Sequence, residues 1–290
     1  MKTSRPTHLA ALALLPLLAV GCCPKCRSAT AISRHMLSAR VTGSPVEPPS
    51  SAVGRMDPAL AYLSQDYLVA EITAGGDRVV GYKIALTHPA SRAAFGAAGP
   101  AYGRIFYTQH RPSGATIPAG RSQRLAIEME VAMVIGRRID KPLASVAELR
   151  PYVRAACPAI ELPRDHFRPD ARRPTFEDLV ADNVGAHRFV LGAEIDPAAA
   201  DLDALSAALS CDGKPVATGK ARDVLGGPWR SLLWLANSLT EAGFRLEPGQ
   251  VVLTGSLAAP YRPPHEAPAG TYVADFGPMG KASVVIAGER

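Results

Sequence analysis

Two glutamates stand close together in a strongly apolar stretch of the sequence, residues 125–136. Glu128 and Glu130 are flanked there by aliphatic and methionine side chains, and the stretch ends at Gly136, which is typical of a buried strand. Side chains alternate between the faces of a strand, so both glutamates are predicted on one face, about 7 Å apart along the backbone. Two buried like charges need a neutralising positive charge, and a hard divalent cation such as Mg²⁺ or Mn²⁺ suits carboxylate oxygens. The alternative is an edge strand whose glutamates face solvent.

Two more charged residues lie in other apolar segments. Lys83 is in the middle of a predicted strand over residues 78–86, and Glu161 is the single carboxylate of the apolar run 157–163. Lys83 is either an edge residue whose ammonium group reaches water or a site lysine that contacts a substrate carboxylate or transfers a proton. In the second case burial lowers the pKa of Lys83 and nearby carboxylates raise it again.

A third candidate segment is the end of a predicted strand at Gly255. Thr254 and Ser256 flank this glycine, and their hydroxyl groups, together with backbone N–H groups, could hold a carboxylate. Ordinary turn chemistry is the alternative for these residues.

The elements that must position these residues are many short strands and a few helices. Capping signals and apolar periodicity predict helices over residues 57–75, 91–95, 145–156, from 175 and over 232–243. Further strands are predicted over residues 103–107, 187–192, 206–211, 214–218, 251–254, 271–276 and 281–286. Because no strand–helix–strand alternation carries a glycine-rich phosphate loop, a nucleotide-binding fold is disfavoured. The pattern predicts the α+β class, with a mixed or antiparallel sheet folded over itself.

Basic residues are concentrated at the N-terminus. The 290 residues are 47% hydrophobic and carry a formal charge of +6, from 32 basic and 26 acidic residues, which is ordinary for a globular enzyme. Six basic residues precede the first acidic one, Glu47: Lys2, Arg5, Lys25, Arg27, Arg34 and Arg40. The remainder of the chain is therefore neutral, which argues against a nucleic-acid-binding protein.

The first residues have the features of an export signal. A basic start is followed by an apolar run over residues 9–20, which is short for a helix that spans a bilayer. Residues 18–22 resemble the lipobox of bacterial lipoproteins, which implies a signal peptide over residues 1–21, lipidation of the Cys22 thiol and anchoring on the periplasmic or outer-membrane side. A plain secretory signal and an N-terminal anchor helix are the alternatives. Residues 22–55 are rich in Ser, Pro and Arg and are predicted to form a flexible tether.

Six segments together resemble the fumarylacetoacetate hydrolase superfamily, most closely its 2-keto-4-pentenoate hydratase and 4-oxalocrotonate decarboxylase branch. The segments are residues 79–89, 127–130, 158–161, 180–183, 233–237 and 252–256. The resemblance extends from about Tyr62 to Ile286. It implies a mixed β-roll or barrel of the C-terminal-domain type over residues 121–290, after a smaller N-terminal α/β part over residues 56–120.

The resemblance also implies a site and a reaction. The metal ligands on matching positions are Glu128, Glu130 and Glu161, with Mg²⁺ or Mn²⁺ as the ion, and Lys83 is the implied catalytic residue. Substrate contacts are expected at Thr87, Thr254, Gly255 and Ser256. The implied activity is that of a lyase in aromatic catabolism, acting on a short 2-oxo or 2-hydroxydienoic acid through a metal-stabilised enolate. Relatives also assemble into oligomers, so a homo-oligomer is expected.

The sequence departs from the family pattern in two places. Hydratases of the branch carry an aspartate where this chain has Ala101, and the His–Glu pair that activates water in the C–C hydrolases of the superfamily is missing. Ala101 and the export signal leave three alternatives to a hydratase, and the missing pair ranks hydrolysis lower. They are a decarboxylase of vinylogous 2-oxo acids, an acylpyruvate-type C–C hydrolase, and a tethered protein that binds 2-oxo acids without turnover.

Overall fold

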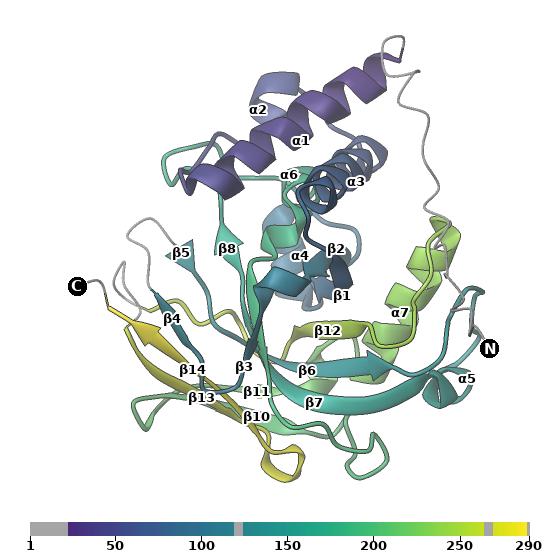
Figure 1. Cartoon of the computed structure of the whole chain (residues 1–290), viewed down its shortest axis with the longest axis vertical. Helices are drawn as coiled ribbons and strands as arrows, with labels where there is room; N and C mark the ends of the chain where they lie inside the picture. The colour runs from purple at the N-terminus through teal and green to yellow at the C-terminus, as the bar shows by residue number, and fades with distance from the viewer. Residues whose placement is uncertain (1–22, 119–123, 264–268, 289–290) are drawn as a thin grey trace, which may run out of the picture.

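A seven-stranded mixed sheet is the centre of the fold (Figure 1). The computed structural model describes residues 23–118, 124–263 and 269–288. The strands of this sheet, in spatial order, are β2 (Ala101–Phe106), β1 (Val79–Ala85), β12 (Val251–Ser256), β6 (Glu128–Ile135), β7 (Val153–Leu162), β9 (Arg188–Leu191) and β3 (His110–Pro112). Most neighbours are antiparallel, while β1 with β12 and β3 with β9 are parallel pairs.

A second sheet of five strands packs against the first. Its order is β11 (Lys214–Lys220), β10 (Ser206–Cys211), β13 (Gly270–Asp275), β14 (Lys281–Ala287) and β4 (Thr116–Pro118), and a two-stranded ribbon joins β5 (Arg124–Leu125) to β8 (Arg164–Asp165). The main apolar core lies between the sheets and includes Val131 and Met133 of β6, Leu209 of β10 and Val284 of β14. The predicted α+β class with a mixed, folded-over sheet is confirmed.

Strand β6 shows why the two glutamates share a face. Met129, Val131 and Met133 lie in the core between the sheets. Ala132 lies in a separate small cluster on the opposite face of the sheet, the face that also carries Glu128 and Glu130. The alternation predicted from the sequence is therefore confirmed.

Helices cover the glutamate-bearing face of the large sheet. They are α1 (Pro24–Thr42), α2 (Ser50–Val53), α3 (Pro58–Ala74), α4 (Pro89–Phe95) and α6 (Phe176–Ala181), whereas α5 (Val146–Leu149) and α7 (Pro228–Glu241) lie elsewhere (Figure 1). Single 3₁₀ turns are η1 (Tyr107–Gln109), η2 (Arg150–Tyr152), η3 (Asn183–Gly185), η4 (Ala221–Asp223) and η5 (Gly277–Met279). The predicted caps are present: Asp57 accepts from the Leu60 N–H at 2.6 Å, and Thr175 forms a capping box with Asp178.

The predicted flexible tether over residues 22–55 is wrong for most of that range. Helix α1 begins with a proline in its first turn, ends at Gly43 with φ +75° and packs on α3 and α6. Its buried face is Ala29, Ile32, Ser33, Met36 and Ala39. This face has helical spacing, but only two of its five residues are large and apolar, so the stripe is weak in the sequence.

The predicted helix over residues 145–156 is also wrong in its second half. The Ser145 cap is present, but α5 ends at Leu149 and is followed by η2, and β7 begins at Val153. Pro151 has no N–H to continue the helix, and the β-branched Val153 favours a strand.

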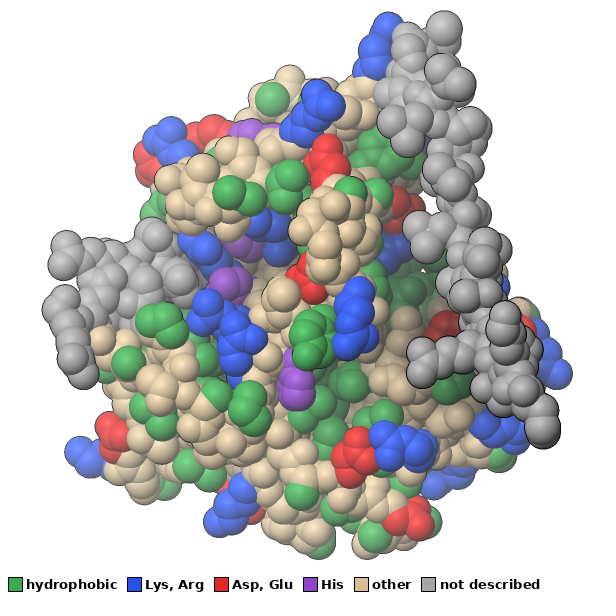
Figure 2. All heavy atoms as spheres, viewed as in Figure 1, with side chains coloured by type: hydrophobic (Ala, Val, Ile, Leu, Met, Phe, Trp, Pro, Cys, Tyr) green, Lys and Arg blue, Asp and Glu red, His purple; other side chains and the backbone are tan. Residues whose placement is uncertain are grey.

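Residues 56–120 do not form a sheet of their own. Strands β1, β2 and β3 of this segment belong to the seven-stranded sheet, and β4 belongs to the five-stranded one. The signal peptide over residues 1–21 and Cys22 lie outside the described residues, and within those that are described no helix has both the length and the apolar character needed to cross a membrane. On the face shown in Figure 2, Lys and Arg side chains are interspersed with Asp and Glu.

Candidate functional site

Four adjacent strands bring the predicted charged residues together. Along the order β1, β12, β6 and β7, Lys83 lies opposite Leu253, and Leu253 lies opposite Ala132. Glu128 of β6 lies directly opposite Glu161 of β7. Residues directly opposite one another point to the same face of a sheet, so the lysine and the glutamates share the face that the helices cover.

The three glutamates form one cluster. Carboxylate oxygens of Glu128, Glu130 and Glu161 lie within 4.8 Å of one another. Glu130 and Glu161 are 0% and 1% exposed, whereas Glu128 is half-buried. The Gly255 N–H donates to Glu130 Oε2 at 2.7 Å, but Glu130 Oε1 and Glu161 Oε2 have no hydrogen-bond partner within the described residues. Buried carboxylate oxygens without partners are costly.

Burial also raises the pKa values of two glutamates in the cluster. Burial, together with the charges of Glu161 and Glu128, raises the pKa of Glu130 well above its ordinary value. Burial also raises the pKa of Glu128 to about 7, although Lys83 partly opposes that shift. Holding the cluster fully ionised therefore requires more positive charge than one lysine supplies.

Lys83 forms an ion pair with the cluster, and the charge of Arg262 also acts on Glu128. Lys83 Nζ lies 2.8 Å from Glu161 Oε1 and donates to the Val184 carbonyl oxygen at 3.2 Å, while the side chain is 3% exposed. Burial alone lowers the pKa of Lys83, but the three carboxylates outweigh it and raise that pKa above its ordinary value. Lys83 is thus a buried lysine paired with a glutamate of the cluster, and the alternative of an edge residue reaching water is wrong.

The donor set fits a hard divalent cation. Three carboxylates with unpaired oxygens provide the all-oxygen ligation that Mg²⁺ and Mn²⁺ favour, and three protein ligands leave positions for water or a small ligand. Two positive charges would also offset the net charge that remains after Lys83 pairs with Glu161.

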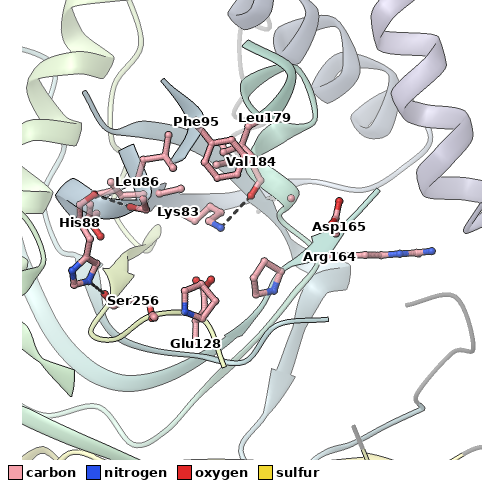
Figure 3. A pocket seen from close by; sticks show the side chains of 18 of the residues that line it. Lys83, Leu86, His88, Phe95, Glu128, Arg164, Asp165, Leu179, Val184 and Ser256 are labelled. Carbon is pink, nitrogen blue, oxygen red and sulfur yellow. Dashed lines mark hydrogen bonds between the residues drawn. The ribbon is translucent and has the colours of Figure 1, made fainter. Parts of the chain in front are cut away.

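A pocket of about 450 Å³ opens beside the cluster, within the range of small-molecule sites. Lys83, Glu128 and Ser256 lie on its sheet side (Figure 3). Leu86, Phe95, Leu179 and Val184 form its apolar side, while the side chain of Arg164 points away from the other labelled residues. Charged and apolar side chains therefore both line the pocket.

The predicted substrate-binding residues occupy different places. Thr87 and Ser256 line the pocket, and Ser256 Oγ has no hydrogen-bond partner within the described residues. The Gly255 N–H is engaged by Glu130, so Gly255 positions a glutamate instead of offering its N–H to a substrate. Gly255 has a φ of +110°, and a β-carbon at this position would lie only 2.5 Å from Cγ2 of Thr87. Glycine is therefore the residue that fits here.

The structure contradicts the predicted substrate contact of Thr254. Its side chain is fully buried, its Oγ1 donates to the Val131 carbonyl oxygen at 2.8 Å, and it does not line the pocket. The register of β12 shifts between Leu253 and Ser256, so Thr254 belongs to the strand interior while Ser256 turns toward the pocket.

Further residues complete the pocket wall. His88 lines the pocket, and its Nε2 lies 2.8 Å from the Ser256 carbonyl oxygen. The turn over residues 182–186 contributes Val184 and Gly185. Ala101 is fully buried in an apolar cluster that includes Leu86 and Val184, directly behind the pocket wall.

Comparisons with known proteins agree with this geometry. The sequence pattern of the fumarylacetoacetate (FAA) hydrolase C-terminal family matches residues 91–279. The chain is 33% identical to the TodF product hydratase of Pseudomonas putida over 218 residues, which are 74% of this chain and 80% of the relative. It is 32% identical to 2-keto-4-pentenoate hydratase 2 of Dechloromonas aromatica over 221 residues, 76% of this chain and 84% of that one.

A solved structure has the same fold. The 4-oxalocrotonate decarboxylase of Pseudomonas putida, complexed with magnesium and adipate, superposes with a TM-score of 0.83 at 24% identity. The superposition covers 90% of this chain and 97% of that enzyme.

Proposed function

Because the chain belongs to the fumarylacetoacetate hydrolase family, we propose that it is a divalent-metal-dependent lyase acting on a short 2-oxo or 2-hydroxydienoic acid, as a 2-keto-4-pentenoate hydratase does. The observation that carries this proposal is the cluster of Glu128, Glu130 and Glu161. Glu130 and Glu161 have buried oxygens without hydrogen-bond partners among the described residues, and Glu128 lines a small pocket beside them. The named hydratases among its relatives support the substrate class.

The proposed residues have separate roles. Glu128, Glu130 and Glu161 hold Mg²⁺ or Mn²⁺, which when bound supplies Lewis-acid stabilisation of negative charge on the keto oxygen of a 2-oxo acid. Lys83 Nζ holds or transfers the proton that the substrate gains or loses. The hydroxyl groups of Ser256 and Thr87 orient the substrate carboxylate, and the apolar wall around Phe95 and Leu179 excludes bulk water from the reacting atoms.

A substrate panel with metal removal tests the proposal. Mg²⁺- or Mn²⁺-loaded protein is expected to convert 2-hydroxypenta-2,4-dienoate, to lose this activity completely in EDTA and to regain it when metal is restored. No turnover by metal-loaded protein of any 2-oxo or 2-hydroxydienoic acid in the panel would contradict the proposal. Binding of oxalate that raises the melting temperature without any turnover would identify a binding protein instead.

One observation favours decarboxylation as the second candidate. Ala101 packs against buried hydrophobic residues, and its own side chain provides no carboxylate to assist the addition of water. A decarboxylase of vinylogous 2-oxo acids would use the same metal centre and Lys83. Turnover of 2-oxohex-3-enedioate with release of CO₂, and none of the dienol substrate, would select this candidate; acylpyruvates in the same panel test for C–C hydrolysis.

We also propose that the protein is exported and anchored through a lipid on Cys22, and that it forms a homo-oligomer. The lipobox-like residues 18–22 support the anchor. In a bacterial host, wild-type protein is expected to incorporate labelled fatty acid and to sediment with membranes, and the Cys22→Ala variant to do neither. Equal labelling of the variant would rule out lipidation at Cys22, and light scattering measures the oligomeric state.

A further inference from the structure

A strained turn forms part of the pocket wall. Asn183 and Val184 have φ values of +52° and +55°, in the left-handed region that non-glycine residues rarely occupy, and a β-branched valine there is a clear outlier. Such a conformation costs about 1–3 kcal/mol per residue and persists only where surrounding contacts impose it. Contacts elsewhere in the fold must therefore hold residues 182–186 in place.

The turn forms a hydrogen bond with Lys83. The Val184 carbonyl oxygen accepts the hydrogen bond from Lys83 Nζ at 3.2 Å, and Figure 3 shows this contact above Glu128. Val184 and Gly185 also line the pocket. Relaxation of the turn would remove the acceptor that, together with Glu161, fixes the position of the ammonium group.

Side-chain hydrogen bonds hold the turn at its centre and at both ends, and one of them runs from Gln109 Nε2 to the Ala186 carbonyl oxygen at 3.1 Å. In its centre, Asn183 Oδ1 accepts from the Arg104 N–H at 2.7 Å and Asn183 Nδ2 donates to the Arg104 carbonyl oxygen at 2.8 Å. At its ends, Arg40 of α1 donates to the Ala186 carbonyl oxygen at 2.8 Å, to Asp182 Oδ1 at 3.0 Å and to the Asp182 carbonyl oxygen. A single guanidinium group thus links the first residue of the turn to the last.

The surroundings keep Arg40 in this position. Its side chain is 11% exposed, and the other oxygen of Asp182 lies 2.9 Å from Nδ1 of the buried His166. Charge-assisted hydrogen bonds of this kind are stronger than neutral ones, and the planar guanidinium group fixes several acceptors at once.

We propose that Arg40 is a positioning residue: it holds the turn over residues 182–186 and thereby fixes Lys83 and the adjacent pocket wall. The inference depends on the proposed function only through the role of Lys83. The metal ligands lie on β6 and β7 and have no contact with Arg40, so the inference predicts an effect on turnover and ligand binding without an effect on metal binding.

The test compares three variants of α1. Arg40→Met keeps the apolar part of the side chain and removes the charge, Arg40→Lys keeps the charge, and Arg34→Ala is a matched control because Arg34 is on the same helix with its side chain 75% exposed. Arg40→Met is expected to lower kcat by about tenfold to a hundredfold, the loss that a small displacement of reacting groups produces. Its affinity for Mn²⁺ alone should equal that of wild type, Arg40→Lys should recover part of the activity, and Arg34→Ala should behave as wild type.

Two further measurements separate positioning from general destabilisation. Millimolar guanidinium chloride is expected to restore activity to an Arg40→Ala variant and not to a Lys83→Met variant. Oxalate binding to Mn²⁺-loaded protein, measured by calorimetry, should weaken in Arg40→Met and not in Arg34→Ala, a result that does not require turnover. The inference would be overturned if folded Arg40→Met kept wild-type kcat and oxalate affinity. It would also be overturned if this variant lost Mn²⁺ affinity together with activity. If the wild-type protein itself showed no turnover, that result would count against the proposed function instead.

Discussion

Replacing Glu130 with glutamine is expected to abolish metal binding and to lower kcat/KM by about a thousandfold, equivalent to roughly 4 kcal/mol of transition-state stabilisation. The neutral amide keeps the shape of the side chain and can still accept the 2.7 Å hydrogen bond from the Gly255 N–H. It lacks the negative charge that a divalent ion requires. Mn²⁺ affinity and turnover, measured on the same preparation, check this expectation.

The same substitution is expected to stabilise the metal-free protein. Burial raises the pKa of Glu130 far above its ordinary value, so the folded state binds a proton that the unfolded chain has released. Stability of the metal-free wild type therefore falls as the pH rises from the ordinary range of a carboxyl group toward the raised pKa, and Glu130→Gln does not share this loss. The melting temperature of the metal-free variant should match or exceed that of wild type at pH 8, with a smaller difference at pH 5.

The exposed Glu194 provides the matched control. Its side chain is 46% exposed and pairs with Arg154, and Glu194→Gln should keep wild-type Mn²⁺ affinity and turnover. Glu130→Gln protein that still binds Mn²⁺ with wild-type affinity would contradict the assignment of the three glutamates as ligands.

Replacing Lys83 with methionine is expected to lower kcat by about a hundredfold to ten-thousandfold, the contribution of a positioned proton-transfer group. The affinity for Mn²⁺ should stay the same or increase. The reason is that Lys83 Nζ lies 2.8 Å from Glu161 Oε1, and removing this cation removes a competitor for the carboxylates. Steady-state kinetics with saturating metal, together with a direct Mn²⁺ titration, measure both effects.

The stability of the Lys83→Met variant, measured with and without Mn²⁺, provides the control for this prediction. Methionine leaves three buried carboxylates without a neighbouring cation, so the metal-free variant is expected to be less stable than wild type and to recover on addition of Mn²⁺. Wild-type kcat in Lys83→Met would show that the lysine is an ion-pair partner of Glu161 without a part in proton transfer.

The local parts of the site could be predicted from the sequence. Alternation along residues 127–135 placed Glu128 and Glu130 on one face because the period of a strand is fixed by backbone geometry. The apolar residues around these two glutamates predicted that they are buried and that a positive charge must neutralise them. The position of Glu161 opposite Glu128 depends on the register of β6 with β7, and register is a property of two strands that neither sequence segment specifies alone.

Two errors had local physical causes. Thr254 and Ser256 stand two residues apart, so simple alternation gives them one face, but the irregular backbone at Gly255, with φ +110°, separates their roles. The sequence of α1 resembles a tether because its buried stripe consists mainly of alanine and serine. Proline at its start and Gly43 at its end were the available signals.

The contribution of α1 to the site could not be predicted by any local rule. Arg40 and Asp182 are separated by 142 residues in the sequence, and only the folded chain brings the guanidinium group to the turn that holds Lys83. The positive φ of Val184 likewise results from tertiary contacts, since a β-branched residue disfavours that conformation, whereas the neighbouring Asn183 is of a type that adopts it more readily.

The most direct test of the metal centre is anomalous diffraction from a crystal soaked with Mn²⁺ and oxalate. The arrangement of the three carboxylates predicts one strong Mn²⁺ peak within bonding distance of Glu128, Glu130 and Glu161, with oxalate bound to the ion and adjacent to Lys83 and Ser256. No Mn²⁺ peak among these carboxylates at saturating metal, or carboxylates hydrogen-bonded to one another in its place, would contradict the account.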